Sequence, residues 1–454
     1  MNIFQINRSD IEDRFDPKYI LYLKDIHNFK YDIFPLKRFL IEKPQYGTAE
    51  IGLPRTSTQQ PRYIRITDIN DFGELDDSLG ATAENCSDEY FLYENDLLFA
   101  RSGATVGKTY LHKHLSYPAF FAGYMIRVRL DESTLLPDYL FAYTQTSFYK
   151  NWVDAIQRAA AQPNINAEEY ASLPIPLPPL SVQQTIVDLY TNAQNQRKRK
   201  LEESQKLLES VDAYLLSELG IELPQEDNSL KNRIFKVSSS HLIGSRWDCS
   251  SNKNDFSLNS KKFENVKLVD VVRINPSVYF PLEIKEITFI PMEAIDEIYG
   301  EITDNYKKEV SESSGFTRFM QGDLLWAKIT PCMQNGKSAV VRETINGYAC
   351  GSTEFFVLRC NKNKIDVNYL FYIMHMKKLL EYATIFFGGN AGQQRVSKDF
   401  LLNLEIPLPP LDKQIDIASK LQEIQNNAKQ LKNEADMILQ EAKQKVERMI
   451  LGDE

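Results

Sequence analysis

The stretch Ile175-Pro176-Leu177-Pro178-Pro179-Leu180 recurs without change at residues 406–411, 231 residues further along the chain. Flanking phrases align at a similar offset: RFD at 14–16 matches RWD at 246–248, and DLLFAR at 96–101 matches DLLWAK at 323–328. Self-similarity at one spacing is the signature of an internal duplication. The chain therefore consists of two copies of one unit.

Each proline phrase predicts a change of local structure. Proline fixes φ and keeps the preceding residue out of the helical region, so the phrase should form an extended connector. The polar segment that follows has helical spacing, and Ser181 or Asp412 is a suitable N-cap for it. Each copy thus predicts a mixed region, a connector and a long helix.

The second long helix carries the apolar seam of a coiled coil, with alternating spacings of four and three. The seam residues are Ile417, Leu421, Ile424, Ala428, Leu431, Ala435, Ile438 and Ala442. The first helix, 181–219, has a seam at Leu201, Leu208, Val211 and Leu215, which the polar stretch 194–200 interrupts. A narrow seam needs a partner, so we expect the two helices, each about 60 Å long by the helical rise, to pair antiparallel. The basic run 197–200 predicts a solvated face.

The mixed regions predict an α+β fold. Short β-rich runs at 63–66, 97–100, 125–128 and 355–358 alternate with Gly, Asn and Asp turns, and helices are expected at 137–152 and 367–383. The predicted domains are a first mixed domain at 1–178, a central helix at 179–224, a second mixed domain at 225–408 and a C-terminal helix at 409–454.

Composition limits the class of protein. The length suits two domains, and 43% hydrophobic and 25% charged residues are ordinary for a globular chain. The sequence has no apolar run of membrane length and no signal-peptide pattern, so a cytoplasmic location is expected. Five scattered cysteines without CxxC spacing predict reduced thiols and no structural metal. The net charge of −9 argues against a protein that coats DNA by itself.

No catalytic motif is convincing. The loop GATVGKT at 103–109 resembles a phosphate-binding Walker loop but has three residues between its glycines, where that loop has four. The adjacent His112 and His114 are expected to be exposed. The chain lacks GxSxG, HExxH and an (N/D)PP(Y/F) methyltransferase motif; NPSV at 275–278 is only a partial echo. We therefore expect no catalysis and no cofactor in this chain.

Polar and basic loops provide candidates for DNA contact, because such side chains reach base edges and phosphates. For each cluster, ordinary loop composition is the alternative reading. The candidates are Arg62, Arg65, Arg101, Ser102, Thr105, Lys108, Gln162 and Asn164 in the first copy, and Lys328, Thr330, Gln334, Asn335, Lys337, Asn390, Gln393, Gln394 and Arg395 in the second.

The duplicated order of elements resembles the specificity subunits of type I restriction-modification systems. The resemblance covers nearly the whole chain and rests on the R-x-D opening, the DLLxA strand, the (N/D)YLF helix start and PLPPL before a Gln-containing helix (Gln183, Gln184 and Gln414). It implies that each mixed domain reads half of a split DNA site, while the paired helices act as a ruler and dock two methyltransferase subunits. It further implies that S-adenosylmethionine, ATP and Mg²⁺ belong to the methyltransferase and restriction subunits.

Two other readings stay open from the sequence. The chain fits equally a related subunit of another restriction or phage-defence assembly, in which nuclease and methyltransferase are fused in one partner. A structural adaptor that binds proteins through its duplicated domains is the alternative from a different class. The adaptor predicts assembly without DNA sequence preference.

The ruler role gives a first testable prediction. Insertion or deletion of a few residues in either long helix should change the gap between the two half-sites and leave the half-sites themselves unchanged. Methylation mapping measures both quantities. An altered half-site with an unchanged gap would contradict the ruler.

Overall fold

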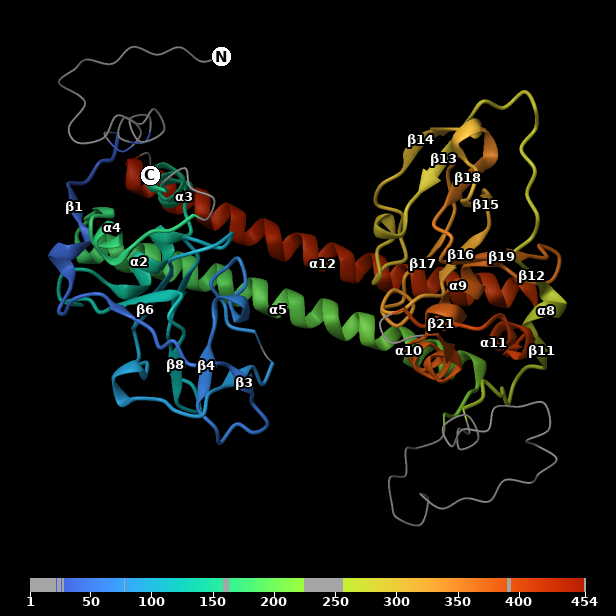
Figure 1. The fold of residues 1–454 in the computed structure, drawn as a ribbon, viewed down its shortest axis with the longest axis horizontal. Coiled ribbons are helices and arrows are strands. Elements are labelled where there is room, and N and C mark those ends of the chain that lie inside the picture. Colours follow the sequence, from blue (N-terminus) through green and yellow to red (C-terminus); the bar gives the residue numbers. More distant parts are fainter. Residues whose placement is uncertain are drawn as a thin grey trace. The chain divides into compact units, whose positions relative to one another are not determined.

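The structure is a computed structural model that describes residues 22, 26, 28–76, 78–157, 163–223, 256–389 and 393–452 (Figure 1). It divides into two compact units. Unit 1 comprises Met1–Leu201 with Asn433–Glu454, and unit 2 comprises Glu202–Lys432. Each unit thus contains one mixed domain together with part of both long helices, whereas the sequence boundaries treat the helices as separate segments.

The two long helices are continuous and pair antiparallel. Helix α5 is Leu180–Leu219 and α12 is Leu411–Leu451. Within unit 2, Lys413 Nζ lies 2.5 Å from Glu218 Oε2, and Ser204 Oγ donates to the Ala428 carbonyl at 2.7 Å. Ser204 contacts Ala428, and the later residue Glu218 contacts the earlier residue Lys413, so the two helices run in opposite directions, as predicted.

The predicted seam of α12 is confirmed, since five of its eight members are buried and Ile424, Leu431 and Ile438 are partly buried. The seam of α5 continues through its polar stretch. Tyr190, Arg197, Ser204 and Val211 follow one another at seven-residue steps and are all buried. The seven-residue repeat of buried positions therefore continues through the polar stretch, although the buried residues there are polar.

The basic run 197–200 is not a uniformly solvated face, contrary to the sequence prediction. Arg197 is buried in unit 1, where its Nη1 lies 2.8 Å from Glu74 Oε2 and its guanidinium lies 4.0 Å from the Phe72 ring centroid. Lys200 pairs with Glu434 at 2.6 Å. Only Lys198 and Arg199 are exposed. Consecutive residues of a helix point in different directions, so the four basic residues of this run have different neighbours.

The predicted N-caps Ser181 and Asp412 are wrong by two residues. The helices begin at Leu180 and Leu411, so both polar residues lie in the first turn. The Pro179 carbonyl accepts from the amides of Val182 and Gln183 at 2.8 and 3.0 Å. A proline carbonyl can start the helix because proline lacks only the donor.

The proline phrases are extended, as predicted, and each forms an edge of a two-stranded antiparallel sheet. Strand β10 (Pro174–Pro176) pairs with β1 (Ile33–Pro35), and β22 (Glu405–Pro407) pairs with β11 (Asn265–Lys267). Proline is tolerated at such edges, where its missing N–H faces no neighbouring strand.

Each unit contains a central antiparallel sheet. In unit 1 the order is β2 (Gln45–Tyr46), β9 (Met125–Val128), β6 (Leu97–Ala100), β7 (Thr109–Leu111). In unit 2 it is β12 (Val272–Ile274), β19 (Phe355–Cys360), β16 (Leu324–Ala327), β17 (Ser338–Val340). The predicted strands at 97–100 and 125–128 are confirmed, and that at 355–358 continues to Cys360.

The central strands are apolar throughout because both of their faces are covered. In β16, Leu324 and Trp326 face a core shared with the long helices, whereas Leu325 faces a second core. In β6, Leu97 and Phe99 likewise face the helices and Leu98 faces the other side. Successive strand residues point to opposite faces, so LLFA of β6 and LLWA of β16 need apolar side chains at every position.

A second sheet covers the other face in each unit. In unit 1 the order is β3 (Leu53–Pro54), β5 (Ala81–Thr82), β4 (Arg62–Ile64), β8 (Ala119–Phe121). In unit 2 it is β14 (Tyr306–Glu309), β13 (Glu286–Ile290), β18 (Tyr348–Gly351), β15 (Thr317–Met320). The pairs β4–β8 and β13–β18 are parallel. Strand β8 lies at the edge of its sheet, whereas β18 lies inside its sheet, between β13 and β15. The strand expected at 63–66 is displaced, because Ile66 begins a 3₁₀ turn.

Short helices complete each α+β unit. They are α2 (Pro137–Thr144), α3 (Ser147–Ile156) and α4 (Ala167–Ala171) in unit 1, and α8 (Leu268–Val271), α9 (Val367–His375), α10 (Lys377–Ala383) and α11 (Lys398–Asn403) in unit 2. The single helices expected at 137–152 and 367–383 are each divided, since Thr146 and Met376 have non-helical backbone. No described helix is long and apolar enough to cross a membrane.

The fold decides the surroundings of the histidines and cysteines. His112 was expected to be exposed but is buried, and burial lowers its pKa to about 4; His114 is exposed. Cys86, Cys332, Cys350 and Cys360 are free thiols, and Cys249 lies outside the described residues. The described residues contain no group of three or more His, Cys, Asp or Glu that would hold a metal ion.

A buried glutamine fixes the start of each long helix. Gln183 Oε1 accepts from the Leu136 amide at 2.9 Å, and its Nε2 donates to the carbonyls of Thr134 and Pro178 at 3.1 and 3.0 Å. Gln414 makes the same three bonds in unit 2, to Asp366 N, Lys364 O and Pro409 O at 2.8–3.0 Å. Each glutamine joins the proline phrase, the helix and the loop before α2 or α9.

Replacing Gln183 by leucine should therefore lower the free energy of unfolding by roughly 2–4 kcal/mol, because each buried backbone group left unpaired costs about 1–3 kcal/mol. Gln184→Leu is the matched control, since Gln184 is exposed and bonds only Asp188 on its own helix. Denaturant titration of both variants measures the difference. Equal stability of the two would contradict a structural role for the buried amide.

Candidate nucleic-acid interface

Two of the predicted loops meet in unit 1 through backbone hydrogen bonds. The Ile165 amide donates to the Arg101 carbonyl at 2.9 Å, and the Gly103 amide donates to the Pro163 carbonyl at 3.1 Å. Arg101 directly follows β6, and residues 163–165 precede α4. We call this contact of residues 101–103 with 163–165 the loop junction of unit 1.

Unit 2 repeats the junction bond for bond. The Val396 amide donates to the Lys328 carbonyl at 2.9 Å, and the Thr330 amide donates to the Gln394 carbonyl at 2.9 Å. Its loop junction is therefore residues 328–330 with 394–396. Because the backbone bonds correspond, Arg101 is equivalent to Lys328, and Asn164 is equivalent to Arg395.

Most candidates in these loops have accessible side chains. Exposed ones are Asn164, Gln334, Asn335 and Gln393, and partly exposed ones are Arg65, Arg101, Ser102, Thr105, Lys328, Thr330, Gln394 and Arg395. Gln162 and Asn390 lie outside the described residues. The structure brings together residues 101–103 with 163–165 in unit 1 and residues 328–330 with 394–396 in unit 2; Arg65 is not part of this contact, and binding of DNA by any of these residues stays a prediction.

Arg62 does not present its guanidinium to solvent. Its side chain is 2% exposed and lies 2.6 Å from Asp76, with a further bond to the Tyr117 hydroxyl at 3.3 Å. Arg65 is partly exposed, but both Nε and Nη2 donate to the Asp68 carboxylate at 3.2 and 2.8 Å. These contacts hold the loop that follows β4.

The candidate lysines Lys108 and Lys337 have partners inside their own units. Lys108 Nζ donates to the Ile69 carbonyl at 3.0 Å and pairs with Asp71 at 2.9 Å. Lys337 Nζ donates to the carbonyls of Ile295 and Met292 at 3.1 and 3.3 Å. Each ammonium group therefore links its own loop to the backbone of a neighbouring turn by hydrogen bonds.

Three residues at the junctions were not among the candidates. The Tyr46 ring lies 4.7 Å from the Arg101 guanidinium. Tyr124 is exposed and its carbonyl accepts from the Arg101 amide at 2.9 Å; Glu354 accepts from Lys328 in the same way. Tyr124 follows Gly123 in a turn between two strands, a pattern that would have indicated an aromatic side chain at a loop tip.

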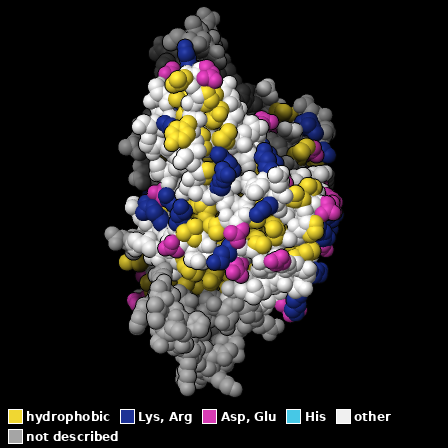
Figure 2. Space-filling model, turned by 90° about the vertical axis from the view of Figure 1, so that its right-hand side faces the viewer, with side chains coloured by type: hydrophobic (Ala, Val, Ile, Leu, Met, Phe, Trp, Pro, Cys, Tyr) yellow, Lys and Arg dark blue, Asp and Glu magenta, His cyan; other side chains and the backbone are white. Residues whose placement is uncertain are grey.

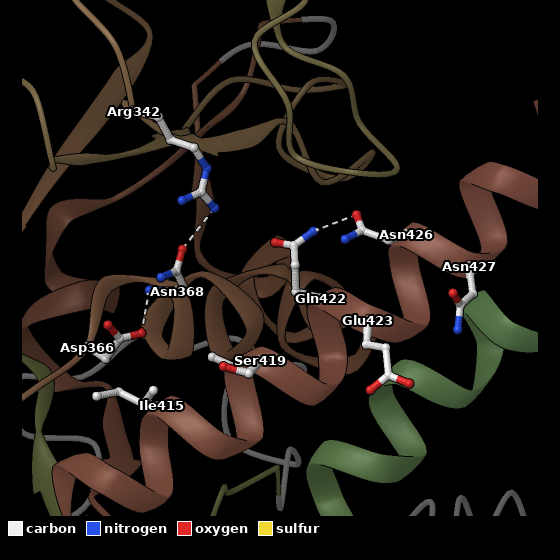
Figure 3. Close-up of a pocket in the computed structure, with 10 residues that line it drawn as sticks. Arg342, Asp366, Asn368, Ile415, Ser419, Gln422, Glu423, Asn426 and Asn427 are labelled. Atoms are coloured by element: carbon white, nitrogen blue, oxygen red, sulfur yellow. Dashed lines mark hydrogen bonds between the residues drawn. The ribbon is translucent and has the colours of Figure 1, made fainter.

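A cavity of about 660 Å³ lies elsewhere in unit 2, between α12 and the start of α9 (Figure 3). Arg342 points toward Asn368 and donates to its Oδ1 at 2.9 Å, while Gln422 bonds Asn426 at 3.2 Å. None of the predicted DNA-contacting residues lines it. The candidate interface is therefore a pair of surface junctions, distinct from this cavity.

The family model described as "Type I restriction modification DNA specificity domain" matches residues 23–208 and 260–437. The chain belongs to this family. The two matched segments correspond to the two copies, each with the part of a long helix that follows it.

Curated relatives of this chain are named specificity subunits of type I restriction enzymes. The chain is 32% identical over 189 residues to the EcoAI specificity subunit of Escherichia coli and 29% identical over 189 residues to the EcoEI specificity subunit. These alignments cover 41% of this chain and 32% of each relative, so the chain matches about a third of their length. The MjaVIII specificity subunit of Methanocaldococcus jannaschii is 22% identical over 379 residues, 80% of both chains.

A solved structure described as "Structural basis underlying complex assembly and conformational transition of the type I R-M system" has the same fold. It superposes with a TM-score of 0.51 at 17% identity and covers 93% of this chain and 96% of that one.

The internal role of Lys337 is testable. Lys337→Met should lower the free energy of unfolding by roughly 1–2 kcal/mol, because its charge-assisted bonds to two carbonyls are lost. It should leave the salt dependence of DNA binding nearly unchanged, whereas loss of a phosphate contact lowers that slope by about one. Lys362→Met, at an exposed position, is the control. A lowered slope with unchanged stability would restore Lys337 to the DNA interface.

Proposed function

We propose that this chain is the sequence-reading subunit of a type I restriction-modification complex, in which each unit reads one half of a split double-stranded DNA site. The loop junctions carry the proposal. Their backbone bonds correspond in the two units, while the side chains on that framework differ: Asn164 against Arg395, and Tyr124 against Glu354. One framework with two sets of polar side chains suits two readers of different targets.

The residue types support reading of bases. Asn pairs well with adenine and Arg with guanine in the major groove, while Ser, Thr and Gln contact several base edges. On the face drawn in Figure 2, Lys and Arg side chains are interspersed with Asp, Glu and hydrophobic ones. The net charge of −9 favours reading at selected points over a continuous basic track.

The chemistry belongs to other subunits in this proposal. Relatives named as specificity subunits of type I restriction enzymes support it. We propose that two methyltransferase subunits dock on the paired helices and bind S-adenosylmethionine, and that a separate ATP- and Mg²⁺-dependent subunit translocates and cuts DNA. The chain itself would contribute binding and no catalytic residue.

Part of the DNA-binding surface is also assigned to the methyltransferase subunits. The acidic chain alone should then bind its site weakly. Nanomolar affinity of the isolated chain near physiological salt would contradict this division, because no partner surface would be needed.

Mapping of methylated adenines tests the function. Cells that carry this gene with its neighbouring methyltransferase should show a split methylated motif that is absent when the gene is deleted. An active methyltransferase without a gene-dependent motif would favour the protein-binding adaptor instead.

Asn164→Ala should relax the motif at one base pair of one half-site, with a loss of roughly 1–3 kcal/mol of discrimination, and leave the other half-site unchanged. Asn151→Ala is the matched control, because Asn151 is an exposed asparagine of α3 outside the junction. The readout is the methylated motif and the melting temperature of each variant. A uniform loss of methylation across both half-sites would indicate a structural role for Asn164.

A further inference from the structure

An arginine and a glutamate form a fixed pair at the loop junction of unit 2. Arg395 Nε donates to Glu354 Oε2 at 2.9 Å, and its Nη2 donates to Glu354 Oε1 at 2.8 Å. Glu354 directly precedes β19, and Arg395 begins β21 (Arg395–Val396), 41 residues later. Two parallel bonds fix the plane of the guanidinium as well as its position.

The pair leaves part of the guanidinium available. Arginine has five N–H donors. Two bond Glu354, and a third, on Nη1, donates to the Gln393 carbonyl at 3.0 Å. The other two have no acceptor among the described residues, and the side chain is 42% exposed. Glu354 occupies the edge formed by Nε and Nη2, so the remaining donors are one N–H on Nη1 and one on Nη2.

Charge at the site favours an anionic or electron-rich ligand. Glu354 is 23% exposed and its pKa is lowered, chiefly by the hydrogen bond from Arg395 and also by the charge of Lys328. One carboxylate is therefore balanced by two cations, and the junction keeps a net positive charge. A carboxylate held in this way supports the arginine without repelling a phosphate backbone.

Unit 1 lacks this arrangement although its backbone matches. Tyr124 and Asn164 stand at the positions of Glu354 and Arg395. Arg101, equivalent to Lys328, lies against the Tyr46 ring. The carboxylate–arginine pair is thus a property of unit 2, and any base preference that it confers should be confined to one half-site.

We propose that Arg395, held by Glu354, reads a guanine in the half-site of unit 2, and that Glu354 is a positioning residue for this contact. The inference rests on the proposed function and specifies its chemistry. Two N–H donors side by side match the O6 and N7 acceptors of guanine in the major groove, a pattern that no other base presents. An arginine without a partner loses rotamer freedom when it binds DNA, which costs free energy. The pair with Glu354 restricts the rotamers of Arg395 before binding and so lowers this cost.

The test uses the full chain assembled with its methyltransferase subunits and DNA duplexes of the mapped site. Each base pair of both half-sites is replaced in turn, and competition binding gives the discrimination at each position. The half-site of unit 2 is the one that Asn164→Ala leaves unchanged. For the unaltered chain, replacement of one G·C pair in that half-site should weaken binding roughly 5- to 150-fold.

Arg395→Lys keeps the charge but lacks the planar group that can make two parallel bonds to the carboxylate and two more to guanine, and should reduce discrimination at this G·C pair to less than about threefold. Glu354→Gln should reduce it at the same pair and no other. The double variant should lose no more than Arg395→Lys alone, since both changes act on one contact. Arg273→Gln, which removes an exposed arginine of β12 in the same unit, is the control for charge.

Melting temperatures close to that of the unaltered chain establish that the variants fold. A half-site of unit 2 without G·C, or full discrimination in Arg395→Lys, would overturn the proposal and leave the proposed function intact. Weaker binding of Glu354→Gln that is equal at every base pair would also overturn the positioning role. Absence of any site preference in the unaltered complex would instead reject the proposed function itself.

Discussion

The architecture depends on the buried amides of Gln183 and Gln414. Each lies at a point where an extended proline strand becomes a helix of forty residues or more, and each bonds three backbone groups, two in the loop before α2 or α9 and one in the proline phrase. An amide has both donors and an acceptor, so it can satisfy a carbonyl and an N–H that would otherwise be buried without partners. The direction of each long helix relative to its own domain follows from this contact.

The central sheet of each unit positions its loop junction. Strands β6 and β16 are covered by the helices on one face and by the second sheet on the other. Residues 101 and 328 leave the sheet directly after these strands and bond the segment that runs into the proline phrase. A rigid, doubly buried strand therefore presents an exposed polar loop, which is the usual division between scaffold and binding surface.

The two units share backbone contacts and differ in the side chains that those contacts position. The salt bridge between Asp323 and Arg359 has its counterpart in Asp96 and Arg129, at 2.7 Å in both cases. At the junctions, by contrast, Asn164 is matched by Arg395 and Tyr124 by Glu354. Buried contacts constrain residue identity through packing and hydrogen bonding, whereas exposed junction positions are free to vary with the target.

The sequence by itself determined the duplication, the α+β class, the extended proline phrases, the antiparallel long helices and the loops that carry polar side chains. These properties follow from periodicity and from local backbone constraints, which act over a few residues. Tertiary structure alone decided which polar side chains stay accessible. The sequence does not distinguish Arg395 from the basic residues Arg62, Arg197, Lys108 and Lys337. The partners of these four are Asp76, Glu74 and backbone carbonyls distant in sequence. The partner of Arg395 is Glu354, the arginine side chain stays 42% exposed, and only the packing of separate loops brings those two residues together.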